Sequence, residues 1–165
     1  ELKILDYNRV VKDLGGQSKA EILERLRPNF NIMPYRRNVA RPSAKGEIGM
    51  YLDHAWFLLT AKNNVKSGDA VKGLDVSILQ DRVLAPVFGI ENPRADARID
   101  FVGGIRGAEE LMERADASQG AAFLMFPTSI QELFRVADAG KLMPPKSTWF
   151  EPKLLSGLFL HSLKD

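Results

Sequence analysis

The sequence predicts an α+β protein with a mixed, partly antiparallel sheet on which three to four helices pack. Three observations support this class: short apolar runs typical of strands, amphipathic segments that begin with helix-capping residues, and a hairpin pattern in the middle of the chain. The hairpin argues against a purely parallel sheet, although strands and helices alternate clearly from Arg98 to the C-terminus.

The N-terminal part is predicted to contain two strands separated by a helix. Leu2–Tyr7 and Phe30–Met33 are the apolar strand candidates. Ser18 and Glu21 have the spacing of a capping box, in which each side chain binds the backbone N–H of the other residue. A helix should therefore begin there and end before Pro28, which cannot sit inside a helix without disrupting it.

A β-hairpin is predicted from Glu47–Leu52 and Ala55–Ala61, with its turn at Asp53 and His54. Asn-Gly is the stronger turn pair, but Asp and His tolerate a positive φ better than most residues. The segment before the hairpin, Pro34–Lys45, is interpreted as a loop.

The next helix is predicted after Asp75, which is placed to cap it. Leu79, Val83 and Val87 recur every four residues, as on one face of a helix. Pro86 should disturb this helix, because its ring clashes with the carbonyl group four residues earlier.

The C-terminal half is predicted to alternate strands and helices. One helix follows the glycine-rich segment Gly103–Gly107, and another begins at the capping-box pair Ser129 and Glu132, with Gly140 just past its end. The predicted strands are Arg98–Val102, Ala121–Phe126 and Leu158–Leu163.

Length and composition indicate a single domain, residues 1–165, with a substantial core. The chain is 45% apolar and 27% charged, which is ordinary for a globular protein. It has no cysteine, which excludes disulfides, thiolate metal sites and thiol catalysis. A net charge of +2 favours neither nucleic-acid nor membrane binding, and no apolar run is long enough for a membrane span. We therefore expect a cytoplasmic protein. The chain begins at Glu1 without an initiator methionine, which indicates a fragment.

A glycine-rich turn after the predicted strand is the first candidate site. The amides of Gly103 and Gly104, together with Arg106, would bind an anion at the start of the next helix. Asp100 is the carboxylate best placed to act as a catalytic base, and Arg98 is a further candidate anion ligand. The alternative is a tight turn with no ligand, because the spacing matches neither G-x-G-x-x-G nor a Walker A loop.

The proline-rich segment Met143–Lys153 is the second candidate. Its prolines stiffen the backbone, while Lys146, Ser147, Thr148 and Lys153 supply cations and hydroxyls that suit a phosphorylated or aromatic ligand. The alternative is a rigid connector whose aromatic residues fill the core. If this segment and the glycine-rich turn form one site, Lys146 should lie near Arg106.

Other chemistry has less support. The basic loop of Arg36, Arg37, Arg41 and Lys45 would contact phosphates or simply remain solvated. The chain has only two histidines, which leaves little material for a metal centre or a Ser-His-Asp triad.

Three stretches resemble the C-terminal region of the bacterial and archaeal family known as domain of unknown function 1015. The segment Arg27–Lys72 carries little of the resemblance. The three stretches are residues 5–14, residues 74–81 together with 98–107, and residues 137–140 together with 143–153.

The resemblance implies that the chain is the C-terminal part of a larger protein whose N-terminal half is absent here. Full-length members carry an Asp-Gly-His-His motif upstream, and this chain lacks it. Members are often encoded beside serine-biosynthesis enzymes. The resemblance implies no established activity and no known cofactor.

Two functional hypotheses follow. In the first, the chain is part of an enzyme that acts on a small phosphorylated metabolite or nucleotide, linked to serine metabolism, with its own N-terminal half completing the site. In the second, it is a non-catalytic ligand-sensing or protein-interaction domain. The expected partner is a small anionic molecule, whereas membranes are excluded and nucleic acid is disfavoured by the charge balance.

Overall fold

The main sheet has six strands in the spatial order β3–β5–β4–β7–β2–β6. Each neighbouring pair runs antiparallel, in this computed structural model of residues 3–36 and 38–152. β1 (Lys3–Leu5) and β8 (Trp149–Glu151) form a separate antiparallel pair. The six strands are β2 (Tyr7–Val11), β3 (Phe30–Tyr35), β4 (Glu47–Leu52), β5 (Ala55–Ala61), β6 (Ile99–Gly103) and β7 (Ala121–Met125).

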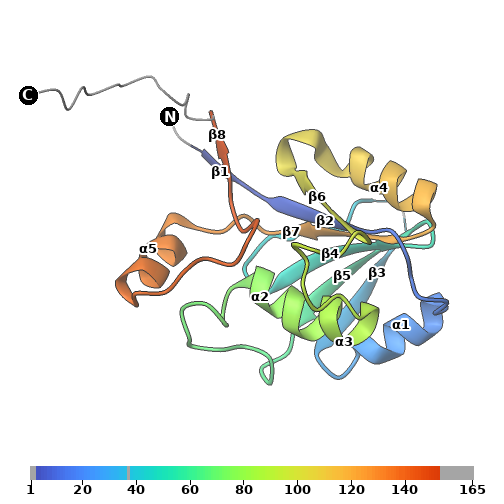
Figure 1. The fold of residues 1–165 in the computed structure, drawn as a ribbon. Helices are drawn as coiled ribbons and strands as arrows, with labels where there is room; N and C mark the ends of the chain where they lie inside the picture. Colours follow the sequence, from blue (N-terminus) through green and yellow to red (C-terminus); the bar gives the residue numbers. More distant parts are fainter. Residues whose placement is uncertain (1–2, 37, 153–165) are drawn as a thin grey trace, which may run out of the picture.

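Helices cover both faces of this sheet (Figure 1). The helices α1 and α2–α3 lie against one face, α4 lies against the other, and α5 stands beside one end of the sheet. The α-helices are α1 (Lys19–Leu26), α2 (Asp75–Leu79), α3 (Ala85–Phe88), α4 (Gly107–Ser118) and α5 (Ile130–Asp138). None of them, within the described residues, has the length and apolarity that a membrane span requires.

The two faces of the sheet carry separate cores, because side chains alternate along each strand. Val11 of β2 belongs to the larger core under α1 and α2–α3, together with Phe123. Val10, its neighbour, belongs to the smaller core under α4, together with Leu111. Each side chain of β2 therefore faces either the larger core or the smaller core, and neighbouring residues face opposite ones.

The predicted α+β class is confirmed, and so are its local signals. The hairpin has the predicted bounds, with Asp53 and His54 both at positive φ in its turn. Both capping boxes form, and each opens a helix at its serine, Ser18 and Ser129. The described sheet is more regular than we expected, since its strand pairs are all antiparallel.

The helix after residue 74 accommodates its proline by a change of helix type. Between α2 and α3, residues Gln80–Leu84 form a π-helical turn, so the chain continues helically from Asp75 to Phe88. A π turn widens the helix just before Pro86, and this relieves the clash that a proline ring makes with the preceding turn. Leu74, not Asp75, is the N-cap residue, and the Asp75 carboxylate instead accepts the N–H of Gly46.

The predicted N-terminal strand is also wrong. Instead of one strand over Leu2–Tyr7, the chain forms β1, breaks at Asp6, and then enters the main sheet as β2 between β7 and β6. The polar pair Asn8–Arg9 lies inside β2 and interrupts the apolar pattern from which strands were predicted. The predicted strand Leu158–Leu163 lies outside the described residues.

Candidate functional site

Arg9 is the most unusual charged residue in the described chain. It lies on β2, faces the larger core, and has only 3% of its surface exposed. In the sheet register it is paired with Phe101 on β6 and with Phe123 on β7, so aromatic residues flank it on both sides. A guanidinium is almost never this buried unless it is paired with an acid.

No carboxylate within the described residues pairs with Arg9. Its Nη2 donates to the carbonyl oxygen of Lys146 at 2.9 Å, and its Nη1 donates to the carbonyl oxygen of Tyr7. The guanidinium carbon also lies 5.3 Å from the centroid of the Phe101 ring, which is a cation–π distance. The two carbonyl oxygens and the ring satisfy some of the N–H groups of the guanidinium. They carry no negative charge, so the positive charge of Arg9 has no counter-charge among the described residues.

Burial affects the titration of Arg9 without discharging it. Loss of hydration lowers the pKa of Arg9 to about 10, because the cationic form is the one that burial disfavours. The guanidinium therefore stays protonated at neutral pH. A buried, permanently charged cation of this kind attracts an anion strongly.

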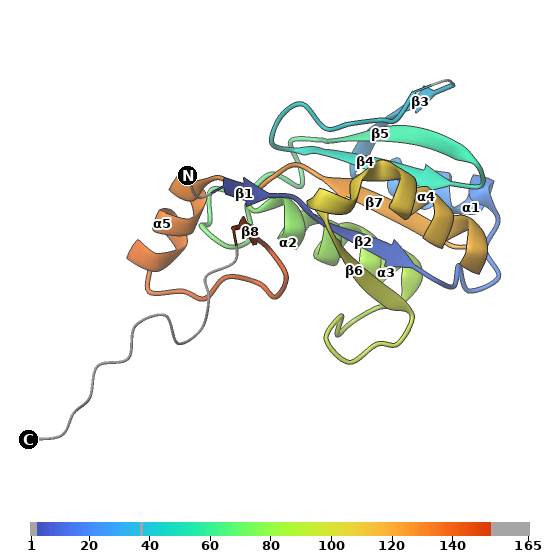
Figure 2. The same cartoon turned by 90° about the horizontal axis from the view of Figure 1, so that it is seen from above.

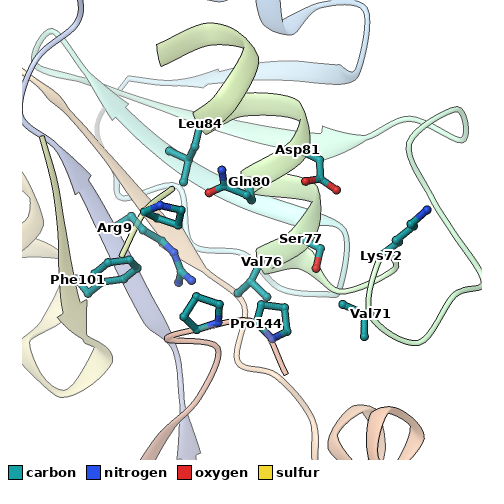
Figure 3. Close-up of a pocket in the computed structure, with 12 residues that line it drawn as sticks. Arg9, Val71, Lys72, Val76, Ser77, Gln80, Asp81, Leu84, Phe101 and Pro144 are labelled. Carbon is teal, nitrogen blue, oxygen red and sulfur yellow. The ribbon is translucent and has the colours of Figure 1, made fainter. Parts of the chain in front are cut away.

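Arg9 faces a cavity of about 240 Å³ between β2, α2 and the Pro144–Lys146 segment (Figure 3). In Figure 3, Arg9 lies on one side of the cavity, and Lys72, Ser77 and Asp81 lie on the other. The remaining walls are mainly apolar and consist of Val71, Val76, Gln80, Leu84, Pro93, Phe101, Pro144 and Pro145. A charged group at the edge of an apolar cavity is the usual composition of a small-molecule site.

The segment Pro144–Lys146, here called the strap, contributes Pro144 and Pro145 to one wall and is fixed by a local turn and by a bond to Thr128. Ser147 Oγ donates to the Pro144 carbonyl at 2.5 Å, and Thr128 Oγ1 donates to the Ser147 carbonyl at 3.0 Å. Lys146 has a φ of 56°, and its Nζ lies 5.5 Å from the centroid of the Tyr7 ring. Arg9 thus binds the strap through a backbone carbonyl, whichever residue occupies position 146.

Asp100, the predicted catalytic carboxylate, lies on the opposite face of β6 from Phe101 and the cavity. Its carboxylate accepts from Lys12 Nζ at 3.2 Å and lies 4.0 Å from Arg114. This is an exposed ion pair on the α4 side of the sheet. A catalytic role for Asp100 stays a prediction.

The two glycines of the predicted anion turn are used for close packing. A Cβ at Gly103 would lie 2.6 Å from the Trp149 ring, and a Cβ at Gly104 would lie 2.1 Å from a carboxylate oxygen of Asp6. The N–H of Gly104 already donates to the Asp6 carbonyl at 2.8 Å. These contacts account for both glycines, and the anion role predicted for them stays untested.

The two predicted arginines have acidic partners. Arg106 lies 3.5 Å from Glu110, one turn later at the start of α4. Arg98 binds Asp96 at 2.7 Å and also donates to the carbonyls of Phe88 and Gly89, so it clamps the loop before β6. The structure thus associates Lys146 with Arg9, whereas Arg106 is the residue that precedes α4, the helix on the other face of the sheet (Figure 2).

Ser147 and Thr148 follow the strap, and the hydroxyl of Ser147 is used within it, whereas Lys153 lies outside the described residues. In the basic loop, Lys45 pairs with Glu132 of α5 at 2.5 Å. Arg36 lines a different cavity, beside Tyr35 and Trp56. Among the described residues, no cluster of His, Asp and Glu has the arrangement to hold a metal ion.

Arg9 itself was missed in the sequence, although one signal was present. An arginine flanked by Asn8 and by the apolar pair Val10–Val11 is at odds with a solvated loop, since the run continues directly into strand-forming residues. Its burial depends on the register of β2 between β6 and β7, and that register is set by residues far away in the sequence.

A family model described as "Protein of unknown function (DUF1015)" matches residues 1–77. This confirms the predicted family over the N-terminal part of the chain, which includes Arg9. The matched range also contains Arg27–Lys72, the segment we expected to carry little resemblance. The quoted stretches 98–107 and 137–153 lie outside it. No curated protein matches the chain.

Two solved structures share the fold. One is a free serine kinase in complex with AMP, at 15% identity and a TM-score of 0.51. The other is a mutant free serine kinase in complex with AMP, at 15% identity and a TM-score of 0.50. Each alignment covers 90% of this chain and 54% of the kinase chain. The chain thus spans about half the length of these structures.

Proposed function

We propose that the chain, whose residues 1–77 match the DUF1015 family model, is part of an enzyme acting on a small phosphorylated metabolite or nucleotide. The observation that carries the proposal is the Arg9 guanidinium, which is buried, has no acidic partner among the described residues, and faces a cavity. The fold shared with an AMP-bound free serine kinase supports it. A link to serine metabolism belongs to the same proposal.

The cavity would contribute binding and charge neutralisation. Phosphoryl transfer requires mainly that the reacting groups are positioned and that their negative charge is stabilised. A guanidinium in an apolar cavity would supply the positioning, because it binds an anionic end of the substrate, its field is only weakly screened, and its orientation is fixed by the two carbonyls. The strap and Lys72 would complete the walls around the bound anion.

Calorimetry on matched arginine variants tests this proposal. Wild type, Arg9→Gln and Arg106→Gln would be titrated with inorganic phosphate, phosphoserine, AMP and ADP. We expect Arg9→Gln to weaken anion binding by about 100-fold, as for loss of a charge-assisted hydrogen-bonded pair, and Arg106→Gln to change it little.

The reverse pattern would place the site at the glycine-rich turn, as the sequence predicted. Equal binding by all three proteins would remove the basis for an Arg9 site. A second measurement separates an enzyme from a ligand-sensing domain. The longer protein, of which this chain would be a part, should transfer or release phosphate from the ligand that binds, whereas a sensor would bind it without turnover.

A further inference from the structure

We infer that the Arg9 cavity selects a monoanionic group carried on an apolar or planar body, and that it discriminates against a dianionic phosphomonoester. A carboxylate and a phosphodiester both have this chemistry. The inference rests on the proposed function, since it takes the cavity as the ligand site. Beyond the proposed function, it specifies the charge and the polarity of the part of the ligand that enters the cavity.

The charged residues that line the cavity are the first reason to expect a monoanion. Arg9 and Lys72 are cationic and Asp81 is anionic, so the lining has one net positive charge. Lys72 and Asp81 are both exposed and lie on the side of the cavity away from Arg9 (Figure 3). Water screens both of these exposed charges, so the buried charge that a ligand must neutralise is the single charge of Arg9.

The free-energy cost of removing the ligand's anionic group from water is the second reason. A monoanion that meets Arg9 forms a neutral pair, and its hydrogen bonds replace those it loses to water. A phosphomonoester carries close to two negative charges above pH 7, so one charge would be left uncompensated in an apolar cavity. That excess charge would also be repelled by the carboxylate of Asp81, which lines the same cavity.

The apolar walls of the cavity indicate the kind of body that the anionic group should be attached to. Val76, Leu84 and Phe101, with the prolines of the strap, present carbon to the interior of the cavity. These surfaces favour an apolar or planar body, because burying it removes apolar area from water on both sides. Only Ser77 and Gln80 add neutral polar groups, and the Gln80 side chain already donates to the carbonyl of Ile90 at 2.8 Å.

The substrate of the proposed enzyme would then enter with its monoanionic end toward Arg9. A phosphoryl group on the same molecule would remain outside the cavity. Asp81 would act as a specificity-determining residue, because its carboxylate keeps the lining at one net positive charge.

A matched series of ring-bearing anions tests the inference. Benzoate, methyl phenyl phosphate and phenyl phosphate carry the same ring and differ in the charge and chemistry of their anionic group. Their dissociation constants would be measured by calorimetry at pH 8, for wild type and for Asp81→Asn. We expect both monoanions to bind wild type about tenfold more tightly than phenyl phosphate. The difference between the two monoanions then tells a carboxylate site from a phosphodiester site.

In Asp81→Asn, phenyl phosphate should gain several-fold in affinity while benzoate changes less. The exposed position of Asp81 makes this variant safe for folding. Tighter binding of phenyl phosphate than of both monoanions would overturn the inference, yet it would leave the proposed anion site standing. If none of the probes binds wild type, the cavity holds no anion, and the proposed function loses its supporting observation as well.

Discussion

Charged side chains on neighbouring strands behave very differently on the two faces of the sheet. On the α4 face, Lys12, Asp100 and Arg114 are partly exposed and neutralise one another. On the other face, Arg9 is buried. Among the described residues, its guanidinium donates only to carbonyl oxygens and lies beside an aromatic ring. The first arrangement is a compensated surface network, which is ordinary, and the second leaves a charge for which a ligand is the natural partner.

The comparison shows that the number and spacing of charges did not reveal the site. The sequence drew attention to Arg106, Arg98 and Asp100, and each of them has opposite charge beside it. Arg9 stands apart only through its burial. The charge of the proposed site is distinguished by the absence of an acidic partner among the described residues, which is a property of the tertiary structure.

The largest expected effect comes from reversing the charge at Arg9. Arg9→Glu would bury a carboxylate against the carbonyl oxygens of Tyr7 and Lys146, and it should lower the free energy of unfolding by at least about 3 kcal/mol. The matched reversal Asp100→Lys, on the exposed face, should cost less than about 1 kcal/mol. Urea unfolding of both variants measures the contrast, which would disappear if the two losses were equal.

Asp75 offers a second comparison with Arg9, because it is a buried acid and its stability contribution depends on pH. Loss of hydration raises its pKa from the ordinary 3.8 to about 6, against the opposing effect of the Gly46 N–H. The folded protein therefore holds this proton more tightly than the unfolded chain does. The resulting stability is complete below about pH 4 and is lost as the pH rises through 6.

Asp75→Asn should remove this dependence, because an amide does not titrate and its oxygen still accepts the Gly46 N–H. We expect the difference in unfolding free energy between wild type and Asp75→Asn to change by about 2 to 3 kcal/mol between pH 4 and pH 7. Thermal unfolding across that range measures it. A difference that stays flat between pH 4 and pH 7 would contradict the assignment.

A smaller effect is expected when Arg9 is replaced by an apolar residue of similar length. Arg9→Met removes a buried charge without leaving an acid unpaired, so its unfolding free energy should stay within about 1 kcal/mol of wild type or rise. Anion binding should nevertheless be lost. Calorimetric unfolding and ligand titration on the same variant separate the two roles. A loss of stability above about 3 kcal/mol would make Arg9 a structural residue and weaken the contrast between the faces.

The smallest effect is expected within the compensated network. A double-mutant cycle with Lys12→Ala and Asp100→Ala should give a coupling energy of about 0.2 to 1 kcal/mol, because both side chains are about two-fifths exposed and water screens them. The coupling should fall further in high salt. A coupling that is large and independent of salt would mean that this face, too, holds a functionally constrained charge.

The sequence alone determined the local structure. The capping boxes at Ser18 and Ser129 and the hairpin turn at Asp53-His54 form because each depends on residues a few positions apart. The alternation of apolar segments was sufficient for the α+β class. Pro86 was correctly expected to disturb its helix, although a π turn rather than a helix end resolved the conflict.

Only the tertiary structure decided the site. The burial of Arg9 follows from the pairing of β2 with β6 and β7, and the cavity is closed by the strap, more than a hundred residues away along the chain. Electrostatic and desolvation effects depend on distances through space, and no local pattern encodes them. The proline-rich segment stood out in the sequence for its stiffness, but its carbonyl contact with Arg9 exists only in the folded chain.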